Sequence, residues 1–327
     1  MTAEATEIGF VAIGRNEGER LRRCLAALPR ESHPVVYVDS ASKDNSVAAA
    51  KALGVVVVAL DESTPLTAAR ARNEGFARLI ADAPNTDYVM FIDGDCELAP
   101  GFPIAARAVF ESDSSCGVIA GRVRERNRDA TIYNRLCDLE WAGPQGEICA
   151  TGGIFMIRRL LFEKVGGFNP MIVAAEDDEL CIRLREAGAK IWRVADDMCF
   201  HDAEMTRFGQ WWRRAVRAGH AYAQVGALHK SYFLPERRRA IGWGLLLPAL
   251  SIGAAPFTGG WSVLALALYP VSYVRTRMRL LNEGSSAADA GLFAAFLTLS
   301  KFPNLIGMAG YWRKRLAGRP VGIVEYK

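Results

Sequence analysis

The chain has 327 residues, of which 50% are apolar and 23% charged, so it is a folded protein and not a disordered one. Its length predicts one large domain with an appendage. The net charge of +4 conceals an asymmetry: residues 1–204 carry 23 Lys and Arg against 32 Asp and Glu, whereas residues 205–327 carry 17 against 4. The basic C-terminal third favours an anionic partner, either lipid headgroups or nucleic acid.

The cysteine pattern and the N-terminus concern the cellular compartment. The seven cysteines are scattered and form no CxxC pair, which argues against a disulfide framework or a zinc knuckle and for a reducing compartment. Residues 1–10 are acidic and lack a basic segment followed by an apolar core, so we expect no secretory signal.

Strand and helix patterns alternate along the first two hundred residues. The predicted strands are 8–13, 34–39, 55–60 and 88–92, and the predicted helices between them are 17–28, 47–53 and 66–80. This alternation predicts right-handed βαβ crossovers and a mostly parallel sheet that is buried on both faces. Further strands are expected at 118–122, 150–157 and 189–195, with helices at about 178–187 and 207–227.

Three polar segments follow predicted strands directly. They are residues 14–17, 39–44 and 93–95, after the first, second and fourth strands. In open α/β sheets the ligand lies outside the carboxyl ends of the strands. We therefore expect one crevice to collect all three segments.

Asp93 and Asp95 end the apolar run of the fourth strand. Gly94 between them permits a turn that lets both carboxylates approach one centre. Paired carboxylates suit a hard divalent cation, Mg²⁺ or Mn²⁺. The alternative is a solvated loop in which the two aspartates cap a helix.

Three other polar residues each have two interpretations. Asp39 would accept hydrogen bonds from a base or ribose, or cap the following helix. Arg72 would meet a phosphate or base, or lie exposed on the surface. His201 would complete a metal site already held by carboxylates, or be structural.

Two longer stretches are also ambiguous. Residues 176–179 are four consecutive acids, read either as a solvated helix N-terminus or as the source of a general base near the crevice. The Arg- and Trp-rich helix at 207–227 suits a membrane interface or a pyrophosphate-bearing ligand, or it packs domains together.

Six segments, in this order, resemble glycosyltransferase family 2 with the GT-A fold. They are IGRNEGERLRRCLAAL, VVYVDSASKDNS, ARARNEG, VMFIDGDCELAPGF, TGGIFMIRRLLFEKVGGFN and AEDDELCIRLREAG. The resemblance covers residues 8–227. It implies a Rossmann-like, mostly parallel sheet flanked by helices, followed here by a C-terminal apolar helical segment. It also implies an inverting, metal-dependent transfer of a hexosyl-type sugar from a nucleotide sugar, usually UDP-linked.

The resemblance also implies residue roles. Asp39 would read the base with the support of Arg72, and Asp177 would be the general base. The implied donor-binding residues are Asn16, Glu17, Asp39, Arg72 and Asp93. The implied ligands of Mg²⁺ or Mn²⁺ are Asp93, Asp95 and His201. The implied acceptor or diphosphate region comprises Gly152, Gly153, Glu176, Gln210, Arg213 and Arg214.

Two departures from the family pattern are visible. Residues 13–17, Ile-Gly-Arg-Asn-Glu, lack the aromatic residue that usually stacks on the base. Arg214 stands where the Gln-x-x-Arg-Trp motif of processive members has its last Trp, so single-sugar transfer is at least as well supported as processive synthesis.

The C-terminal third holds two uncharged apolar runs, residues 241–257 and 261–274. As helices they would reach about 25 and 21 Å, short of the roughly 30 Å hydrocarbon core. Arg237–Arg239 precede the first run, and Arg275, Arg277 and Arg279 follow the second. This predicts a hairpin that enters the membrane from the cytoplasm, the alternative being a buried helical subdomain.

We therefore expect a catalytic domain at 1–204, an interfacial helix region at 205–235 and a membrane-associated segment at 236–327. The expected partners are a nucleotide-sugar donor, a lipid-linked or glycan acceptor and membrane lipids, without nucleic acid, at the cytoplasmic face of the cell membrane. Two rival functions stay open. One is a haloacid dehalogenase-like phosphatase, with Asp93 phosphorylated and Asp177 and Asp178 holding Mg²⁺. The other is a non-catalytic membrane scaffold with a degenerate nucleotide site.

Overall fold

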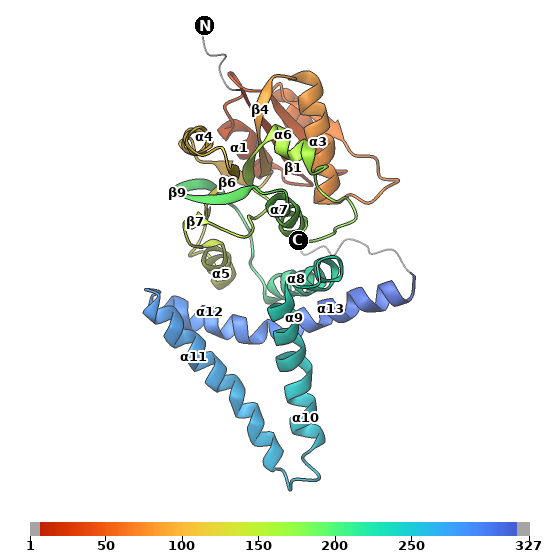
Figure 1. Cartoon of the computed structure of the whole chain (residues 1–327), viewed down its shortest axis with the longest axis vertical. Coiled ribbons are helices and arrows are strands. Elements are labelled where there is room, and N and C mark those ends of the chain that lie inside the picture. The colour runs from red at the N-terminus through yellow and green to blue at the C-terminus, as the bar shows by residue number, and fades with distance from the viewer. Residues whose placement is uncertain (1–6, 319–327) are drawn as a thin grey trace. The chain divides into compact units, whose positions relative to one another are not determined.

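The computed structural model describes residues 7–318 (Figure 1). The chain divides into two compact units. The first, called the sheet unit, comprises Met1–Arg128 and Glu140–Glu204; the second, called the helical unit, comprises Asp129–Leu139 and Met205–Lys327.

The first four strands of the sheet unit form the predicted parallel sheet. They are β1 (Glu7–Gly14), β2 (Val35–Asp39), β3 (Val56–Ala59) and β4 (Thr86–Asp93), in the spatial order β3-β2-β1-β4. The register pairs Gly14 with Asp39 and Ile13 with Asp93. The carboxyl ends of β1, β2 and β4 therefore meet at one edge, as the sequence predicts.

The rest of the sheet is mixed, which corrects the expectation of a mostly parallel sheet. Its strands are β5 (Cys96–Leu98), β6 (Cys116–Glu125), β7 (Gly146–Glu147), β8 (Phe155–Arg158) and β9 (Lys190–His201). β8 runs antiparallel to both β4 and β6, and β5 and β7 run antiparallel to β9. The helix between β6 and β8, α5 (Ile132–Trp141), lies mostly in the helical unit, so no βαβ crossover connects them.

Helices cover both faces of the sheet, and each face has its own apolar core. One face packs against α1 (Glu19–Ala27), α2 (Ser46–Ala52) and α4 (Phe102–Ser112). The other packs against α3 (Ala68–Asp82), α6 (Arg159–Lys164) and α7 (Glu176–Glu186). Residues 88–92 of β4 are consecutively buried because a central strand is covered on both sides.

The helical unit centres on the crossing of two helices, α8 (Phe208–Leu228) and α13 (Lys301–Leu316). Gly219 lies against the backbone of Asn304, and Gly307 lies against the backbone of Val216, where any Cβ would overlap. These two glycines let the helix backbones approach closely. The remaining helices are α9 (Leu234–Ile241), a π-helical turn (Gly242–Leu246), α10 (Leu247–Gly253), a 3₁₀ segment (Trp261–Ala267), α11 (Leu268–Asn282) and α12 (Ala287–Leu299).

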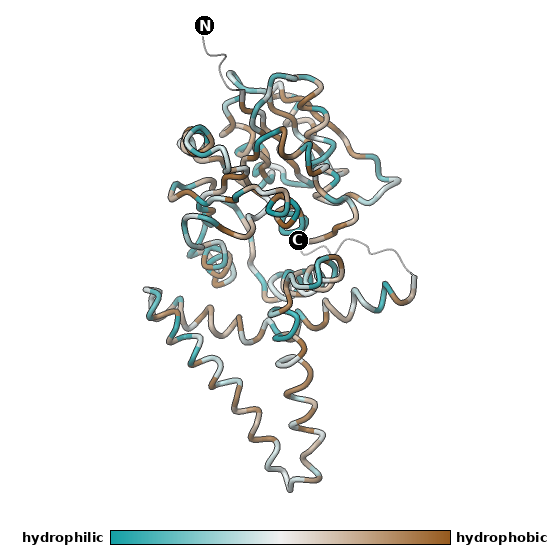
Figure 2. Tube along the Cα trace, in the orientation of Figure 1, coloured by the Kyte–Doolittle hydropathy of each residue, from teal (hydrophilic) through white to brown (hydrophobic). Residues whose placement is uncertain are grey.

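The two predicted apolar runs form the arms of a helical hairpin, drawn as the brown segments in Figure 2. The Ser262 hydroxyl donates to the Ser251 carbonyl oxygen at 2.6 Å, which joins the arms near their tip. Large apolar side chains on both arms are exposed, among them Leu250 at 67%, Phe257 at 89% and Leu264 at 63%. The alternative of a buried subdomain is therefore wrong for these residues.

Among the described residues, one helical stretch, Ala287–Leu316, has the length and apolar composition to cross a membrane. It spans α12 and α13. Neither arm of the hairpin, each of which lies within residues 7–318, meets that criterion, which agrees with their short predicted reach.

Candidate active site

The loops after β1 and β2 are joined by hydrogen bonds. The Asn16 amide donates to the Ser42 hydroxyl oxygen at 2.8 Å, and the Asn16 side-chain oxygen accepts from the Lys43 amide at 2.7 Å. Asn16 has a positive φ of 56°, a conformation that Asn tolerates better than most residues. The predicted gathering of these polar segments at one edge is thus present in the fold.

Asp39 is buried, and its carboxylate is held from two sides. The Tyr37 hydroxyl donates to Oδ1 at 2.9 Å, and the Ser42 amide donates to Oδ2 at 2.8 Å. Burial and the neighbouring Asp39 charge both raise the pKa of Tyr37, which keeps this hydroxyl a donor. The helix-cap alternative for Asp39 is wrong, because α2 begins after Asn45.

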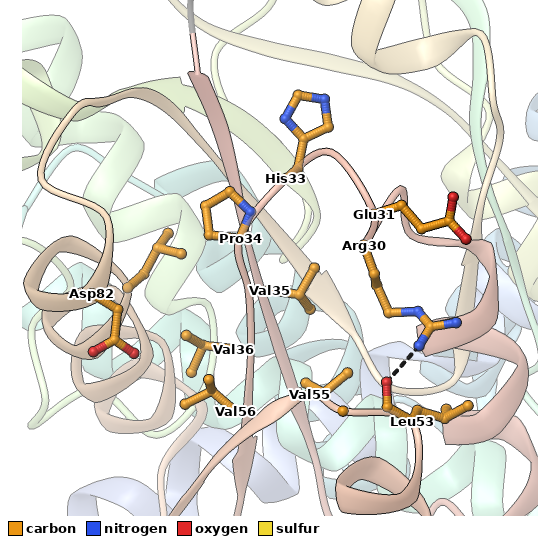
Figure 3. Close-up of a pocket in the computed structure, with 12 residues that line it drawn as sticks. Arg30, Glu31, His33, Pro34, Val35, Val36, Leu53, Val55, Val56 and Asp82 are labelled. Atoms are coloured by element: carbon orange, nitrogen blue, oxygen red, sulfur yellow. Dashed lines mark hydrogen bonds between the residues drawn. The ribbon is translucent and has the colours of Figure 1, made fainter.

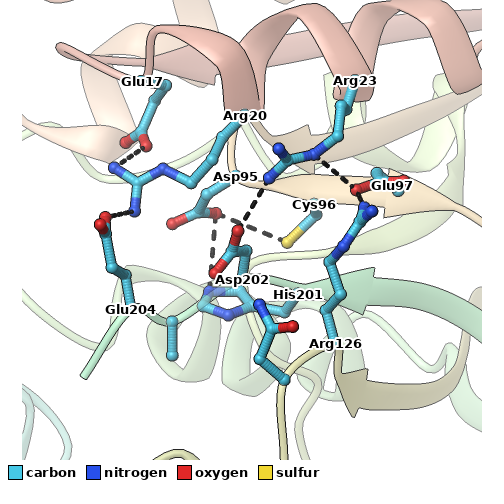
Figure 4. A network of polar contacts seen from close by, with 12 residues as sticks. Glu17, Arg20, Arg23, Asp95, Cys96, Glu97, Arg126, His201, Asp202 and Glu204 are labelled. Atoms are coloured by element: carbon cyan, nitrogen blue, oxygen red, sulfur yellow. Dashed lines mark hydrogen bonds and ion pairs between the residues drawn. The ribbon is translucent and has the colours of Figure 1, made fainter. Parts of the chain in front are cut away.

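Glu17 lies between the first loop and the Asp93–Asp95 turn. A Cβ added to Gly14 would come 3.2 Å from the Glu17 Cγ, and one added to Gly94 would come 3.4 Å from it. The Glu17 carboxylate pairs with Arg20 at 2.8 Å, and Arg20 also pairs with Glu204 at 2.8 Å (Figure 4). The small residues at positions 14 and 94 therefore make room for an acidic side chain.

Arg72 connects three elements of the site. It lies on the buried face of α3 together with Gly75, where the missing side chain lets the helix approach Val11 of β1 and Val38 of β2 closely. Its Nη2 donates to Asp93 Oδ1 at 2.8 Å, and its Nη1 donates to Glu176 Oε1 at 2.7 Å. α3, β4 and α7 are thus joined by one guanidinium.

The environment of Arg72 corrects the interpretation of this residue as an exposed arginine. The side chain is 3% exposed, and the guanidinium lies 5.4 Å from the centre of the Phe168 ring. Burial lowers its pKa, but Asp93 and Glu176 outweigh burial and raise the pKa above its ordinary value. Its ion-pair partners are these two acids and not Asp39, the base-reading residue it was expected to assist.

Gly153 is the point where the loop before β8 meets this ion pair. A Cβ on Gly153 would overlap the Arg72 guanidinium and lie 3.4 Å from Asp93 Oδ2, whereas Gly152 has open space around it. Only a residue without a side chain fits at position 153.

Asp95 and His201 come together through strand pairing. β5 pairs with β9 so that Cys96 lies opposite His201, and His201 Nε2 is 3.5 Å from Asp95 Oδ1. Arg23 links the two paired strands, because it contacts Glu97 of β5 at 3.0 Å and Asp202, directly after β9, at 2.8 Å (Figure 4).

Donor atoms of Asp95, Cys96 and His201 lie within 4.8 Å of one another. A carboxylate and an imidazole are donors that Mn²⁺ accepts, so these residues fit a divalent cation. Asp93 lies outside this group, because Arg72 holds its Oδ1. The predicted role of Asp93 as a second carboxylate ligand of the same metal stays a prediction.

Glu125 is a residue that the sequence reasoning missed. Its Oε2 lies 3.7 Å from His201 Nδ1 and accepts from the Ala203 amide at 3.1 Å, while Oε1 accepts from the Asn127 amide. A carboxylate behind a ligating imidazole orients the ring. Glu125 ends β6, so the strand-end rule that selected Asp93 would also have found it.

The four acids of residues 176–179 divide into two kinds. Glu176 and Glu179 are buried and paired, the first with Arg72 and the second with Arg183 at 2.7 Å. Asp177 and Asp178 are partly exposed. The interpretation of this run as a fully solvated helix start is therefore wrong.

The carboxylate of Asp177 has a perturbed pKa. Burial raises its pKa well above the ordinary value, Asp178 and Glu176 add to the rise, and Arg72 opposes it. A carboxylate with a raised pKa is a stronger base than an ordinary aspartate, which suits proton abstraction.

The three remaining residues of the predicted site, Gln210, Arg213 and Arg214, lie on α8 of the helical unit. The Gln210 Oε1 accepts from the Thr206 and Arg207 amides, each at 2.9 Å, and so caps the start of that helix. A role for these residues toward acceptor or diphosphate stays a prediction.

A cavity of about 410 Å³ lies at the opposite, amino edge of β2 and β3 (Figure 3). Its lining includes Arg30, His33, Val35, Val55 and Asp82. None of the predicted site residues lines it, so this cavity is not the predicted nucleotide site.

The chain matches two family profiles, which overlap in the sequence. Residues 11–166 match the sequence profile of Glycosyl transferase family 2, and residues 141–315 match that of Glycosyl transferase family 21. The pre-mycofactocin glycosyltransferase of Mycobacterium tuberculosis is 25% identical over 247 residues, which cover 71% of this chain and 50% of that protein. The O-antigen chain rhamnosyltransferase RfbN of Salmonella typhimurium is 24% identical over 186 residues, covering 53% of this chain and 58% of that protein.

The chain thus spans only 50% and 58% of the length of these two curated relatives. Among solved structures, the mannosyltransferase PcManGT from Pyrobaculum calidifontis, in complex with GDP-Man and Mn²⁺, is similar with a TM-score of 0.56 at 22% identity. The match covers 96% of this chain and 88% of that one, and it confirms the fold class.

The Arg72 ion pairs generate a stability prediction. Arg72→Met should destabilise the protein by about 3–5 kcal/mol, because it leaves the buried Glu176 and the adjoining Asp93 without their cation. Arg78→Met is the matched control on the same helix, since its pair with Asp82 at 2.7 Å is exposed and should contribute below about 0.5 kcal/mol. Urea unfolding of both variants measures the two losses in the free energy of unfolding. Equal losses would show that the Arg72 ion pairs stabilise the protein no more than the exposed Arg78–Asp82 pair does.

The raised pKa of Asp177 generates a pH prediction. The folded protein binds this proton more tightly than the unfolded chain, so the free energy of unfolding falls as pH rises from about 4 through the folded pKa. Asp177→Asn mimics the protonated form and should be more stable than wild type at pH 7, with the difference vanishing near pH 4. Asp87→Asn, an exposed site on β4, controls for the loss of one acidic charge. An Asp177→Asn protein that is less stable than wild type at pH 7 would contradict the expected repulsion.

Proposed function

The chain belongs to glycosyl transferase family 2, and on that premise we propose that it transfers a sugar from a UDP-linked donor to a lipid-linked or polysaccharide acceptor. The reaction takes place at the cytoplasmic face of the membrane. The observation that carries the proposal is the cluster at the carboxyl edge of β1, β2 and β4. This edge carries Asp39, the Asp95–His201 pair and the Arg72–Asp93–Glu176 ion pairs, and Asp177 follows Glu176 at the start of α7.

The donor is bound along this edge. Asp39 accepts hydrogen bonds from the base, since its carboxylate has lone pairs beyond those used by Tyr37 and Ser42. Asp95 and His201 would hold Mg²⁺ or Mn²⁺, with Glu125 orienting the imidazole from behind. A metal held there would supply positive charge for the leaving nucleoside diphosphate.

Asp177 performs the proton transfer. It takes the proton of the acceptor hydroxyl as the hydroxyl oxygen attacks the anomeric carbon and the bond from that carbon to the diphosphate breaks. Attack opposite to the leaving group inverts the anomeric configuration. Glu176 cannot perform this role in its present position, because Arg72 neutralises it.

The two rival functions have weaker support. A haloacid dehalogenase-like phosphatase needs Asp93 as a nucleophile, but Arg72 holds that carboxylate in an ion pair. A scaffold with a degenerate site would not need a crowded, proton-binding Asp177 beside intact donor-side acids.

We also propose that the helical unit attaches the enzyme to the membrane. Its hairpin exposes Leu250, Phe257 and Leu264, and arginines flank the outer ends of both arms. Apolar side chains with a basic border favour the interface of a bilayer with anionic lipids.

The metal-dependent donor site generates the first prediction on function. UDP should raise the melting temperature in Mn²⁺ but not in chelator. At a hundredfold excess over Kd, ligand binding adds about 2.7 kcal/mol to the free energy of unfolding. Asp95→Ala should remove the metal dependence, whereas Glu97→Gln on the same strand should keep it. Equal stabilisation with chelator would exclude a metal bridge, and stabilisation by GDP instead of UDP would reassign the base.

The proposed role of Asp177 generates the second prediction on function. Asp177→Asn should lower the transfer rate by about 10²–10⁴, that is about 2.7–5.5 kcal/mol of barrier, while it binds UDP and Mn²⁺ as the parent does. Asp178→Asn, one residue along the same helix, should stay active. Normal turnover by Asp177→Asn, or loss of its donor binding, would show that the role is misassigned.

The exposed hairpin generates the third prediction on function. Leu250→Glu with Leu264→Glu should abolish flotation with anionic vesicles and leave the fold intact, because both side chains are exposed. Ile104→Glu with Leu160→Glu is the matched control, since these exposed apolar residues lie in the sheet unit. Undiminished flotation of the hairpin variant would contradict the proposal.

A further inference from the structure

Arg193 occupies a position on β9 where its strand neighbours are small. In the sheet it lies opposite Ala120 of β6 on one side and Gly146 of β7 on the other. The side chain is partly buried, and its Nε atom is shielded from solvent.

The Arg193 guanidinium makes no hydrogen bond and no ion pair with any residue between 7 and 318. This contrasts with Arg72 on α3 and with Arg158 on β8. Arg72 contacts two acids, and Arg158 donates to the carbonyl oxygens of Cys116 and Phe110. A partly buried cation without a partner is costly, so its retention calls for a ligand.

A second arginine makes the cost larger. Burial lowers the pKa of Arg193, and the nearby positive charge of Arg122 lowers it further. Arg122 follows Ala120 by two residues on β6, the strand beside β9. Two guanidiniums in one partly buried region attract an anion, and arginine forks match the oxygens of phosphate.

Gly143 covers the head of Arg193. A Cβ at this position would overlap the Arg193 Nη1, so the loop backbone passes directly over the guanidinium. The same loop continues through β7 to Gly153, where it meets Arg72 and Asp93. Its two ends therefore contact Arg193 and the ion pairs of the candidate active site.

We propose that Arg193, beneath the loop at Gly143, and the nearby Arg122 form a binding site for a phosphate-type oxyanion. The site is separate from the Asp95–His201 pair. The anion is either free inorganic phosphate or a phosphomonoester carried by a larger molecule. The proposal does not depend on sugar transfer, because binding is measured without donor or acceptor.

The test compares the melting temperature of the full chain with and without inorganic phosphate, at constant ionic strength kept with chloride. Wild type should be stabilised by phosphate, and Arg193→Met should lose most of that response. Without phosphate, Arg193→Met should melt at or above the wild-type temperature, because it removes an unpartnered charge. Arg124→Met is the matched control, since Arg124 lies on β6 but is exposed and pairs with Asp197 at 2.7 Å; it should keep the full response.

Two further arms complete the test. Arg193→Gln keeps a polar head and decides the same question if Arg193→Met does not fold. Glycerol 3-phosphate distinguishes the sources, because tighter Arg193-dependent binding than that of phosphate would identify a phosphomonoester, and weaker binding would identify free phosphate. An equal phosphate response in wild type and both Arg193 variants, or no response in wild type, would overturn the proposal.

Discussion

The buried guanidinium of Arg72 is the interaction on which the candidate active site depends. It holds Asp93 at the end of β4 and Glu176 at the start of α7, residues that are far apart in the chain. Two acids and one arginine in a site this poorly solvated are stable only as a set, because each partner compensates the desolvation of the others. The close approach of α3 at Gly75 and the absence of a side chain at Gly153 both make room for this set.

Arg72 also makes the acids of the site differ in how far their charge is neutralised. It neutralises Glu176 and one oxygen of Asp93, and Tyr37 and Ser42 satisfy Asp39. Burial and the charges of Asp178 and Glu176 raise the pKa of Asp177, and Arg72 opposes them only in part. Neighbouring carboxylates thus acquire different chemistry from their surroundings, which the proposed division between donor binding and proton transfer requires.

The helical unit differs from the sheet unit in its packing and in its surface. Its interior depends on glycines at the crossing of α8 and α13, whereas its hairpin leaves apolar side chains on the surface. Exposed apolar side chains over this many residues are the observation behind the proposed attachment to a lipid surface. The excess of basic residues after position 204 supports the same proposal, because basic residues attract anionic headgroups.

The sequence by itself determined the parallel half of the sheet, the gathering of polar loops at its carboxyl edge and the position of Asp93 and Asp95 after the fourth strand. These follow from local rules: apolar runs of strand length, helical spacing and the position of acids after strands. Only the tertiary structure decided that β8 runs antiparallel, that Arg72 pairs with Asp93, and that Glu176 and Glu179 are buried and paired. Glu125 and Arg193 also acquire their surroundings only when β6 and β9 pair. Their partners are separated by dozens of residues, and no local pattern encodes which distant side chain will fill the space beside them.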